Sequence, residues 1–218
     1  REKGFYMANG HEAGTLILNQ LKTFTESVAY FEQVLSPALL KGIDSCVEAF
    51  CDERDDWNGE FNLADESNCW LTPINWVINQ DENDSESKAW FYIDGVNDND
   101  EYWETLFCGV GSTGGEAGFM FDCNKKAFGG KKAWLNHLKK VDKILEDILE
   151  LGFKNMNDGN FFLPIKLDSQ LLAKTWDDYG KFTNEDECFQ PVNEALDTLE
   201  KSVPFFDALM QSCKLNTK

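Results

Sequence analysis

The chain has 218 residues, of which 42% are hydrophobic and 13% aromatic, and its formal net charge is −19. An aromatic content this high excludes a disordered acidic tail, and the length allows one sizeable core. The negative charge argues strongly against direct binding to nucleic acid or to an anionic membrane surface, because both would repel the protein.

The negative charge is concentrated in residues 42–124. This segment contains 20 acidic residues and two basic ones, Arg54 and Lys88, and so carries −18 of the total charge of −19. A general adaptation to salt or for solubility would spread the charge over the whole surface. The concentration therefore favours a basic partner, such as a cationic protein, a nucleic-acid-binding protein or a metal cation.

The N-terminal part predicts two helices. Apolar residues recur at alternating steps of four and three, as on one face of an amphipathic helix, at Ile17, Leu21, Phe24, Val28, Phe31 and Leu35. Ser36 and Pro37 then predict the N-cap and first turn of a second helix, which runs to about Cys51. The two helices form either a hairpin or one bent helix. Residues 1–12 are expected to be a tail.

The middle of the chain predicts an antiparallel meander. Strands are expected at 69–78, 88–95, 103–110 and 117–123, after an acidic loop at 52–68. Pro73 restricts the first strand to an edge or a bulge. The second strand is apolar on both faces, which predicts a sheet that is covered on both faces at its centre.

The C-terminal part predicts helices and one more strand. The clearest helix spans 131–151, and its buried stripe consists of Trp134, Leu138, Val141, Leu145 and Ile148. Gly152 suits the position after its end. Residues 161–167 predict a strand, which Pro164 places at an edge. Asp168 predicts the N-cap of a short helix, and Pro191 predicts the start of a last helix that Pro204 kinks or restarts.

These elements predict one α+β domain over residues 13–218. We expect an antiparallel meander of four to five strands packed with N-terminal, central and C-terminal helices. Seven cysteines occur without a Cys-x-x-Cys pair, and most of them lie in apolar runs. Buried thiols of this kind are typical of a reducing compartment, so a cytoplasmic protein is expected. No apolar run of 18 residues and no signal-peptide pattern is present.

Motifs that suggest chemistry have simpler interpretations. The glycines of 109–114 match the spacing of a dinucleotide-binding loop, but a strand-like segment follows instead of a helix, so a hairpin loop is predicted. Residues 94–101 have the composition of a calcium loop but lack its glycine at the sixth place. His11 lies in the expected tail. His137 is expected to be partly exposed on its helix.

One enzymatic alternative rests on the order of the elements. The order α-β-β-β-α-β is also the core of nucleases that hold Mg²⁺ with acidic residues on adjacent strands. Glu86, Asp94 and Asp122 are the candidate ligands here. An active nuclease also needs a basic path for phosphates. A lysine cluster exists, and it forms either an anion site or, as electrostatics favours, a surface that faces the acidic segment: Lys125, Lys126, Lys131, Lys132, Lys139 and Lys140.

The function predicted from the sequence is that of an acidic, non-catalytic binding protein. It engages a basic, nucleic-acid-binding protein as an inhibitor, an immunity protein or a DNA mimic, with no catalytic residue, metal or cofactor of its own. The alternatives are a metal-dependent nuclease-like enzyme, active or degenerate, and an acidic scaffold domain without a charge-specific role. Self-association stays open. The predicted partner-binding residues are Asp52, Asp55, Asp56, Trp57, Asp81, Glu82, Asp84, Asp98, Asp100 and Glu101, with Trp57 as an exposed anchor.

The arrangement of the acidic residues depends on the connections of the meander. Successive links of a meander alternate between its two ends, so the acidic clusters at 81–86 and 94–101 should lie about 20–25 Å apart. The segment 52–68 then decides whether the acid forms one continuous face or two separate poles. A surface that imitates DNA needs the continuous face.

Overall fold

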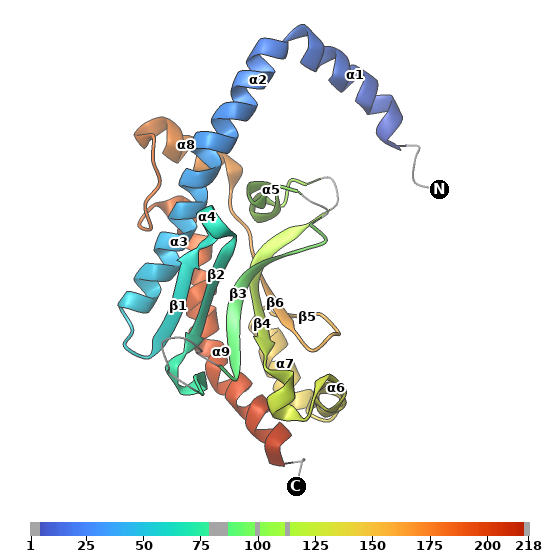
Figure 1. Cartoon of the computed structure of the whole chain (residues 1–218), viewed down its shortest axis with the longest axis vertical. Coiled ribbons are helices and arrows are strands. Elements are labelled where there is room, and N and C mark those ends of the chain that lie inside the picture. Colours follow the sequence, from blue (N-terminus) through green and yellow to red (C-terminus); the bar gives the residue numbers. More distant parts are fainter. Residues whose placement is uncertain (1–4, 79–86, 99–100, 112–113, 216–218) are drawn as a thin grey trace.

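The structure of the protein, a computed structural model, describes residues 5–78, 87–98, 101–111 and 114–215. It contains one antiparallel sheet of six strands in the order β1-β2-β3-β4-β6-β5, together with helices, so the predicted α+β class is confirmed (Figure 1). The strands are β1 (Trp57–Asn62), β2 (Asn68–Pro73), β3 (Ala89–Val96), β4 (Glu116–Cys123), β5 (Lys154–Asn155) and β6 (Phe161–Ile165).

Two parts of the predicted meander are wrong. Residues Trp103–Cys108 form helix α5 instead of a strand; Trp103 and Phe107 stand four residues apart with ring centroids 5.9 Å apart, and Gly109 ends the helix at φ +61°. The predicted loop at 52–68 contains β1, in which apolar or small residues alternate with polar ones from Trp57 to Asn62. The expected strands at 88–95, 117–123 and 161–167 correspond to β3, β4 and β6.

The two prolines lie in strands that are not at the edge of the sheet. Pro73 is the last residue of β2, beyond Trp70 and Leu71, which pair with β3. Pro164 faces Gly118 of β4, whereas β5 pairs with residues 161–162 and ends before the proline. A Cβ atom at Gly118 would lie 2.1 Å from the carbonyl oxygen of Leu163, so β4 and β6 can approach at this point because the residue is glycine.

The N-terminal helices form one bent rod. Helix α1 (Phe5–Asn19) is followed by α2 (Leu21–Tyr30), a π-helical turn (Phe31–Leu35) and α3 (Ser36–Asp52). The chain stays helical through Ser36 and Pro37, so the predicted N-cap at Ser36 is wrong and the bent-helix alternative is correct. Because Pro37 has no N–H group to donate backward, the regular ladder is interrupted there, and the π-helical turn accommodates the interruption.

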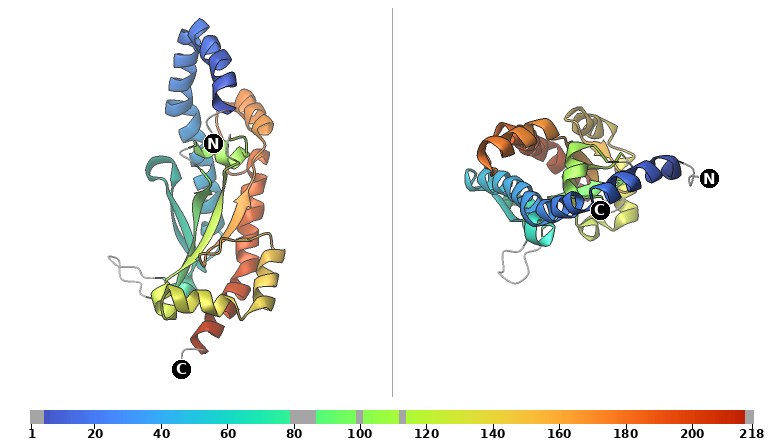
Figure 2. Two further views of the ribbon diagram at one scale, coloured as in Figure 1. Left: turned by 90° about the vertical axis from the view of Figure 1, so that its right-hand side faces the viewer. Right: turned by 90° about the horizontal axis from the view of Figure 1, so that it is seen from above.

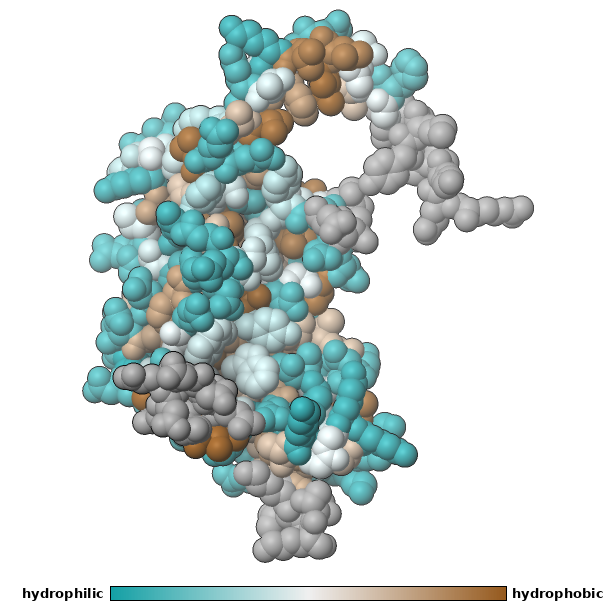
Figure 3. All heavy atoms as spheres, viewed as in Figure 1, coloured by the Kyte–Doolittle hydropathy of each residue, from teal (hydrophilic) through white to brown (hydrophobic). Residues whose placement is uncertain are grey.

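Helices α1 and α2, residues 5–30, project from the body, and we call them the arm (Figures 1 and 2). Large apolar side chains of the arm are exposed: Leu16 is 62% exposed, Leu18 71%, Leu21 53% and Phe24 44%. Figure 3 shows hydrophobic atoms gathered at the outer end of the arm. Leu21 and Phe24 belong to the predicted apolar stripe, so the described part of the chain leaves this part of the stripe uncovered.

Helices α3 and α9 (Gln190–Leu215) cover one face of the sheet, which we call the inner face (Figures 1 and 2). Phe206 of α9 is fully buried at its centre. Its ring stacks on Phe121 with the centroids 3.9 Å apart and meets Phe91, Phe153 and Phe161 at 5.7, 5.3 and 5.7 Å. This aromatic cluster joins three strands to the last helix.

The remaining helices follow several sequence signals. The predicted helix 131–151 is divided by a turn into α6 (Lys131–Leu138) and α7 (Asp142–Glu150). The side chain of Asp168 caps α8 (Ser169–Tyr179) by accepting from the N–H groups of the second and third residues after it. Helix α9 continues through Pro204. The other short helices are α4 (Leu63–Glu66) and the 3₁₀ turns at 74–76, 125–128 and 187–189. Within the described ranges, no helix is long and apolar enough to span a bilayer.

His137 is buried, at 4% exposure, so the prediction of a partly exposed side chain is wrong. Its Nε2 atom lies 3.0 Å from the hydroxyl of Ser212 and 3.2 Å from the carbonyl oxygen of Leu209. Burial lowers the pKa of His137 from its ordinary value of 6.5, although the contact with Leu209 acts in the opposite direction.

The first prediction concerns the aromatic cluster. Phe206→Ala should lower the free energy of unfolding by about 3–5 kcal/mol, because the lost ring leaves a cavity among four phenylalanines. Urea unfolding measures the change. Lys201→Ala, at an exposed position of the same helix, is the control and should change stability by less than about 0.5 kcal/mol. Equal effects of the two substitutions would contradict the central role of Phe206.

The second prediction concerns pH. Below about pH 6.5 the unfolded chain binds a proton at His137 that the folded chain takes up only at lower pH. The stability contributed by neutral His137 is therefore present above about pH 6.5 and is lost as the pH falls from there through the lower pKa of the folded state. Unfolding measured at about pH 8 and about pH 5 should show a smaller loss for His137→Gln than for the wild type. An identical loss in both proteins would rule out this contribution.

Candidate functional site

The acidic residues predicted to bind a partner lie at both ends of the sheet. Asp52, the last residue of α3, is exposed, as are Asp55 and Asp56 just before β1. Asp98 is exposed beyond the end of β3. The start of β1 pairs with the end of β2, at the end of the sheet where β3 begins. The eight residues of β3 then separate the two groups by about 23 Å. The exposed aspartates of the predicted partner-binding set thus form two acidic poles.

The other predicted partner-binding residues either lie outside the described residues or are not exposed at the ends of the sheet. Asp81, Glu82, Asp84 and Asp100 lie outside the described residues. Glu101 is half-buried beside Gly111, where an added Cβ atom would meet its carboxylate. Trp57 is 7% exposed and packs between Phe50 of α3 and Phe91 of β3, with ring centroids 5.2 and 6.2 Å away. The prediction that Trp57 is an exposed anchor is therefore wrong.

A different set of aromatic residues reaches the surface. On the face of the sheet opposite α3 and α9, Trp70, Trp90 and Tyr92 are half-buried and line a hollow of about 610 Å³. Trp70 and Tyr92 are direct partners across β2 and β3, and Trp90 is two residues before Tyr92 on the same face. We call this surface the aromatic hollow; the other residues that line it are Asn68, Ser87, Asp122 and Asn124. Figure 3 shows the face on which it lies.

The prediction that both faces of the sheet are covered is correct for part of the sheet. Met120 and Phe162, which are partners across β4 and β6 on the outer face, are buried. The neighbouring aromatic residues on β2 and β3 remain half-buried. A strand that is apolar on both sides predicts cover on both faces. The sequence therefore could not show which part of the outer face is covered and which part is open.

Carboxylates surround the aromatic hollow. The indole N–H of Trp70 donates to Glu60 at 3.2 Å. Burial, followed by the nearby charges of Asp94 and Asp122, raises the pKa of Tyr92 to about 12. Burial also raises the pKa of Asp94, against the hydrogen bond from the N–H of Gly95. The hydroxyl of Tyr92 therefore stays protonated at neutral pH and presents a donor to its acidic neighbours.

One lysine of the predicted basic cluster contacts this surface. The Nζ atom of Lys125 donates to Asp122 and to the side-chain oxygen of Asn160, at 2.5 and 2.7 Å. The pair is half-buried, with the two side chains 19% and 24% exposed. At this position the lysine cluster faces the acidic segment, as electrostatics favours, and contacts the hollow through Asp122.

The geometry separates the ligands that the nuclease alternative requires. Asp94 faces Gly118, whereas Asp122 faces Trp90, so the two carboxylates are four residues or about 13 Å apart along the strands. Glu86 lies outside the described residues. Where the structure describes side chains, it contains no group of three or more residues arranged to hold a metal ion. The glycine-rich segment after α5 leads directly into β4, so it connects a helix to a strand and is not a hairpin.

All seven cysteines are buried and unpaired. The pKa values of Cys46, Cys51 and Cys123 are each raised to about 12, and burial is the largest cause in each case. A thiol with such a pKa is a poor nucleophile at neutral pH, because the reactive form is the thiolate. The cysteines are therefore packing residues, and none of them offers an activated nucleophile.

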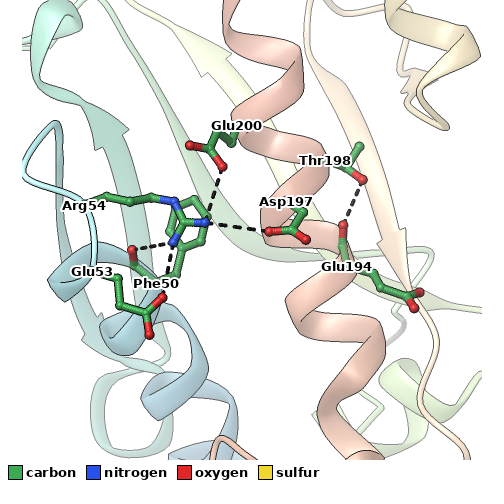
Figure 4. Close-up of polar contacts among 7 residues, drawn as sticks. All are labelled: Phe50, Glu53, Arg54, Glu194, Asp197, Thr198 and Glu200. Carbon is green, nitrogen blue, oxygen red and sulfur yellow. Dashed lines mark hydrogen bonds and ion pairs between the residues drawn. The ribbon is translucent and has the colours of Figure 1, made fainter.

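Arg54, one of the two basic residues of the acidic segment, is held by the body of the protein (Figure 4). Its guanidinium lies 3.9 Å from the ring centre of Phe50 and donates to the backbone oxygen of the same residue at 3.2 Å. It also reaches α9, where Glu200 accepts at 3.3 Å and Asp197 lies at 3.8 Å. Arg54 therefore links α3 to α9 and neutralises their acidic side chains.

The third prediction tests this link. Arg54→Ala should lower the free energy of unfolding by about 1–2 kcal/mol, because it removes charge-assisted hydrogen bonds and leaves the carboxylates of α9 to repel those of α3. Arg54→Lys is the matched control; it keeps the charge but loses the planar group, and its loss should be smaller. Urea unfolding at low and high salt measures both. A loss that does not decrease at high salt would contradict the electrostatic part.

The chain was compared with protein-family models, with curated proteins and with solved structures. None of these three comparisons found a match. The function is therefore inferred from the chemistry of the surfaces described above.

Proposed function

We propose that the protein is a non-catalytic binding protein that engages a basic protein partner through the aromatic hollow. The observation that supports this proposal is the combination of Trp70, Trp90 and Tyr92 with carboxylates on one open face of the sheet. Aromatic faces attract the ammonium of lysine and the guanidinium of arginine, by about 0.5–2 kcal/mol for each contact. Adjacent carboxylates strengthen the preference for a cationic side chain.

The acidic poles serve the same function at longer range. The carboxylates of Asp52, Asp55 and Asp56 at one end of the sheet, and of Asp98 at the other, are exposed to solvent. Exposed charges of one sign accelerate the encounter with a basic protein and make association sensitive to salt. The poles thus attract the partner, and the aromatic hollow supplies the desolvated contact.

This division of roles favours an inhibitor or immunity protein over a DNA mimic. A DNA mimic needs a continuous row of negative charge, whereas Asp52, Asp55 and Asp56 are separated from Asp98 by the length of β3. The partner binds nucleic acid in this proposal, and the protein blocks its cationic surface without itself contacting nucleic acid. The seven unpaired thiols fit a reducing compartment, which supports the cytoplasm as the location.

The fourth prediction concerns the partner. The protein, immobilised, should capture a basic protein from its native lysate at low salt and release it as salt rises. Trp90→Ala should weaken binding of the captured protein about 30-fold, because it removes a contact worth about 2 kcal/mol at the centre of the interface. Calorimetry with the purified partner measures the affinity, and a melting curve confirms that the variant is folded.

Tyr179→Ala is the matched control. Tyr179 is 67% exposed on α8, outside the aromatic hollow, so its removal should leave the affinity unchanged. Capture of no basic protein at low salt would contradict the proposed function. Equal affinities of the Trp90 and Tyr179 variants would contradict the assignment of the interface to the hollow.

A further inference from the structure

A second hollow lies at the base of the arm. It has a volume of about 470 Å³ and lies between the start of α3, α5 and α8. We call it the arm groove; its apolar lining includes Leu35, Leu39, Leu172, Trp176 and Phe182. Leu35 and the neighbouring Phe31 belong to the apolar stripe of the bent rod, which continues outward through Phe24 and Leu21 of the arm. Phe31 and Leu35 thus belong both to the stripe and to the lining of the groove.

The walls of the arm groove are fixed by contacts between segments far apart in the sequence. The rings of Phe31 and Tyr102 meet edge to face with centroids 5.1 Å apart, and the hydroxyl of Tyr102 donates to Glu32 at 2.8 Å. On the opposite side, Trp176 packs against Phe182 at 5.3 Å. The groove thus exists in the protein without a bound partner, which reduces the entropic cost of binding.

Glu104 introduces a charged group into this apolar surface. It lines the arm groove, and both of its carboxylate oxygens are buried without a hydrogen-bond partner among the described residues. Asp177 is the second acidic residue of the lining, and the described lining includes no lysine or arginine. A buried carboxylate without a partner is costly, so a donor that arrives from outside would gain a strong interaction.

We propose that the arm groove and the stripe of the arm bind a cationic amphipathic helix of the basic partner, with a lysine or arginine of that helix reaching Glu104. This inference rests on the proposed function, since it assigns a second docking surface to the same class of partner. The spacing of four and three residues along the stripe is that of a seam between helices, which favours a helix as the occupant. The buried carboxylate requires that this helix carry a positive charge.

Two other occupants fit the observations less well. A second copy of the chain would bring its own arm. Lys22 is the one lysine or arginine of residues 5–30, and its Nζ atom lies 3.7 Å from the carboxylate of Glu26 on an exposed face. Glu104 would then remain without a partner. An anionic membrane surface would be repelled by a protein with a net charge of −19.

The fifth prediction uses a synthetic amphipathic helix of leucine and lysine as the probe, titrated into the full chain by calorimetry. Glu104→Gln should weaken binding of this peptide about 30-fold, because it removes the acceptor of a buried charge pair. Glu146→Gln is the matched control, which removes the same charge from an exposed position of α7, outside both hollows, and should change the affinity less than about two-fold. Leu21→Asp, at an exposed position of the arm, should abolish most of the binding without affecting the fold.

Glu104→Gln should also raise the melting temperature of the free protein, because a neutral amide costs less to bury than a carboxylate. A structural role of Glu104 in a network would instead lower it. Two peptide controls complete the test: the same sequence with glutamate for lysine, and a scrambled sequence of the same composition without an apolar face. Both should fail to bind.

Several outcomes would overturn the inference. Equal weakening by Glu104→Gln and Glu146→Gln, or equal binding of the scrambled peptide, would show that general charge attraction explains the binding. Self-association that Leu21→Asp abolishes would identify a second copy as the occupant, and binding to phosphatidylserine vesicles would identify a membrane. If the captured basic partner binds the Glu104 and Leu21 variants with wild-type affinity, the inference fails while the proposed function stands. Capture of no partner by the wild type contradicts the proposed function itself.

Discussion

The fold depends on the packing of Phe206 against the inner face of the sheet. One ring of α9 contacts phenylalanines of β3, β4 and β6 and also Phe153, so a single side chain holds together strands that come from both halves of the chain. The remainder of α9 and α3 extends this cover along the same face. Because both long helices are used on one side, the opposite side keeps an uncovered region, and that region presents Trp70, Trp90 and Tyr92.

Because the two long helices cover one side of the sheet, the carboxylates of the protein have two different roles. The carboxylates of α9 face Arg54 and help to hold α3 in place, so part of the acid stabilises the fold. The carboxylates at the ends of the sheet, such as Asp55 and Asp98, face solvent and are available to a partner. A net charge counted along the sequence does not distinguish these roles, since each depends on the side of the sheet that the helices occupy.

Hydrophobic periodicity correctly predicted those elements whose apolar residues follow one clear spacing. β3, β4, β6 and the capped helix at Asp168 appear where the sequence places them. The aromatic run at 103–108 is short enough to form a strand or a helix. Gly109, which suits the position after the end of a helix, was the local signal that favours the helix. β1 was missed because its acidic surroundings outweighed a clear alternation. The burial of His137 and Trp57 depends on contacts with distant segments, which local patterns do not contain. The aromatic hollow and the arm groove were not predicted for the same reason.

The position of α9 in the chain has a consequence for folding during synthesis. This helix follows all six strands, so every strand is synthesised before the helix that places Phe206 on the inner face of the sheet. Until then the phenylalanines of β3, β4 and β6 have no helical partner on the side of Phe206. Early intermediates therefore present an aromatic sheet surface, which exposes them to aggregation, and the high negative charge of the strand-forming segment keeps such nascent chains apart.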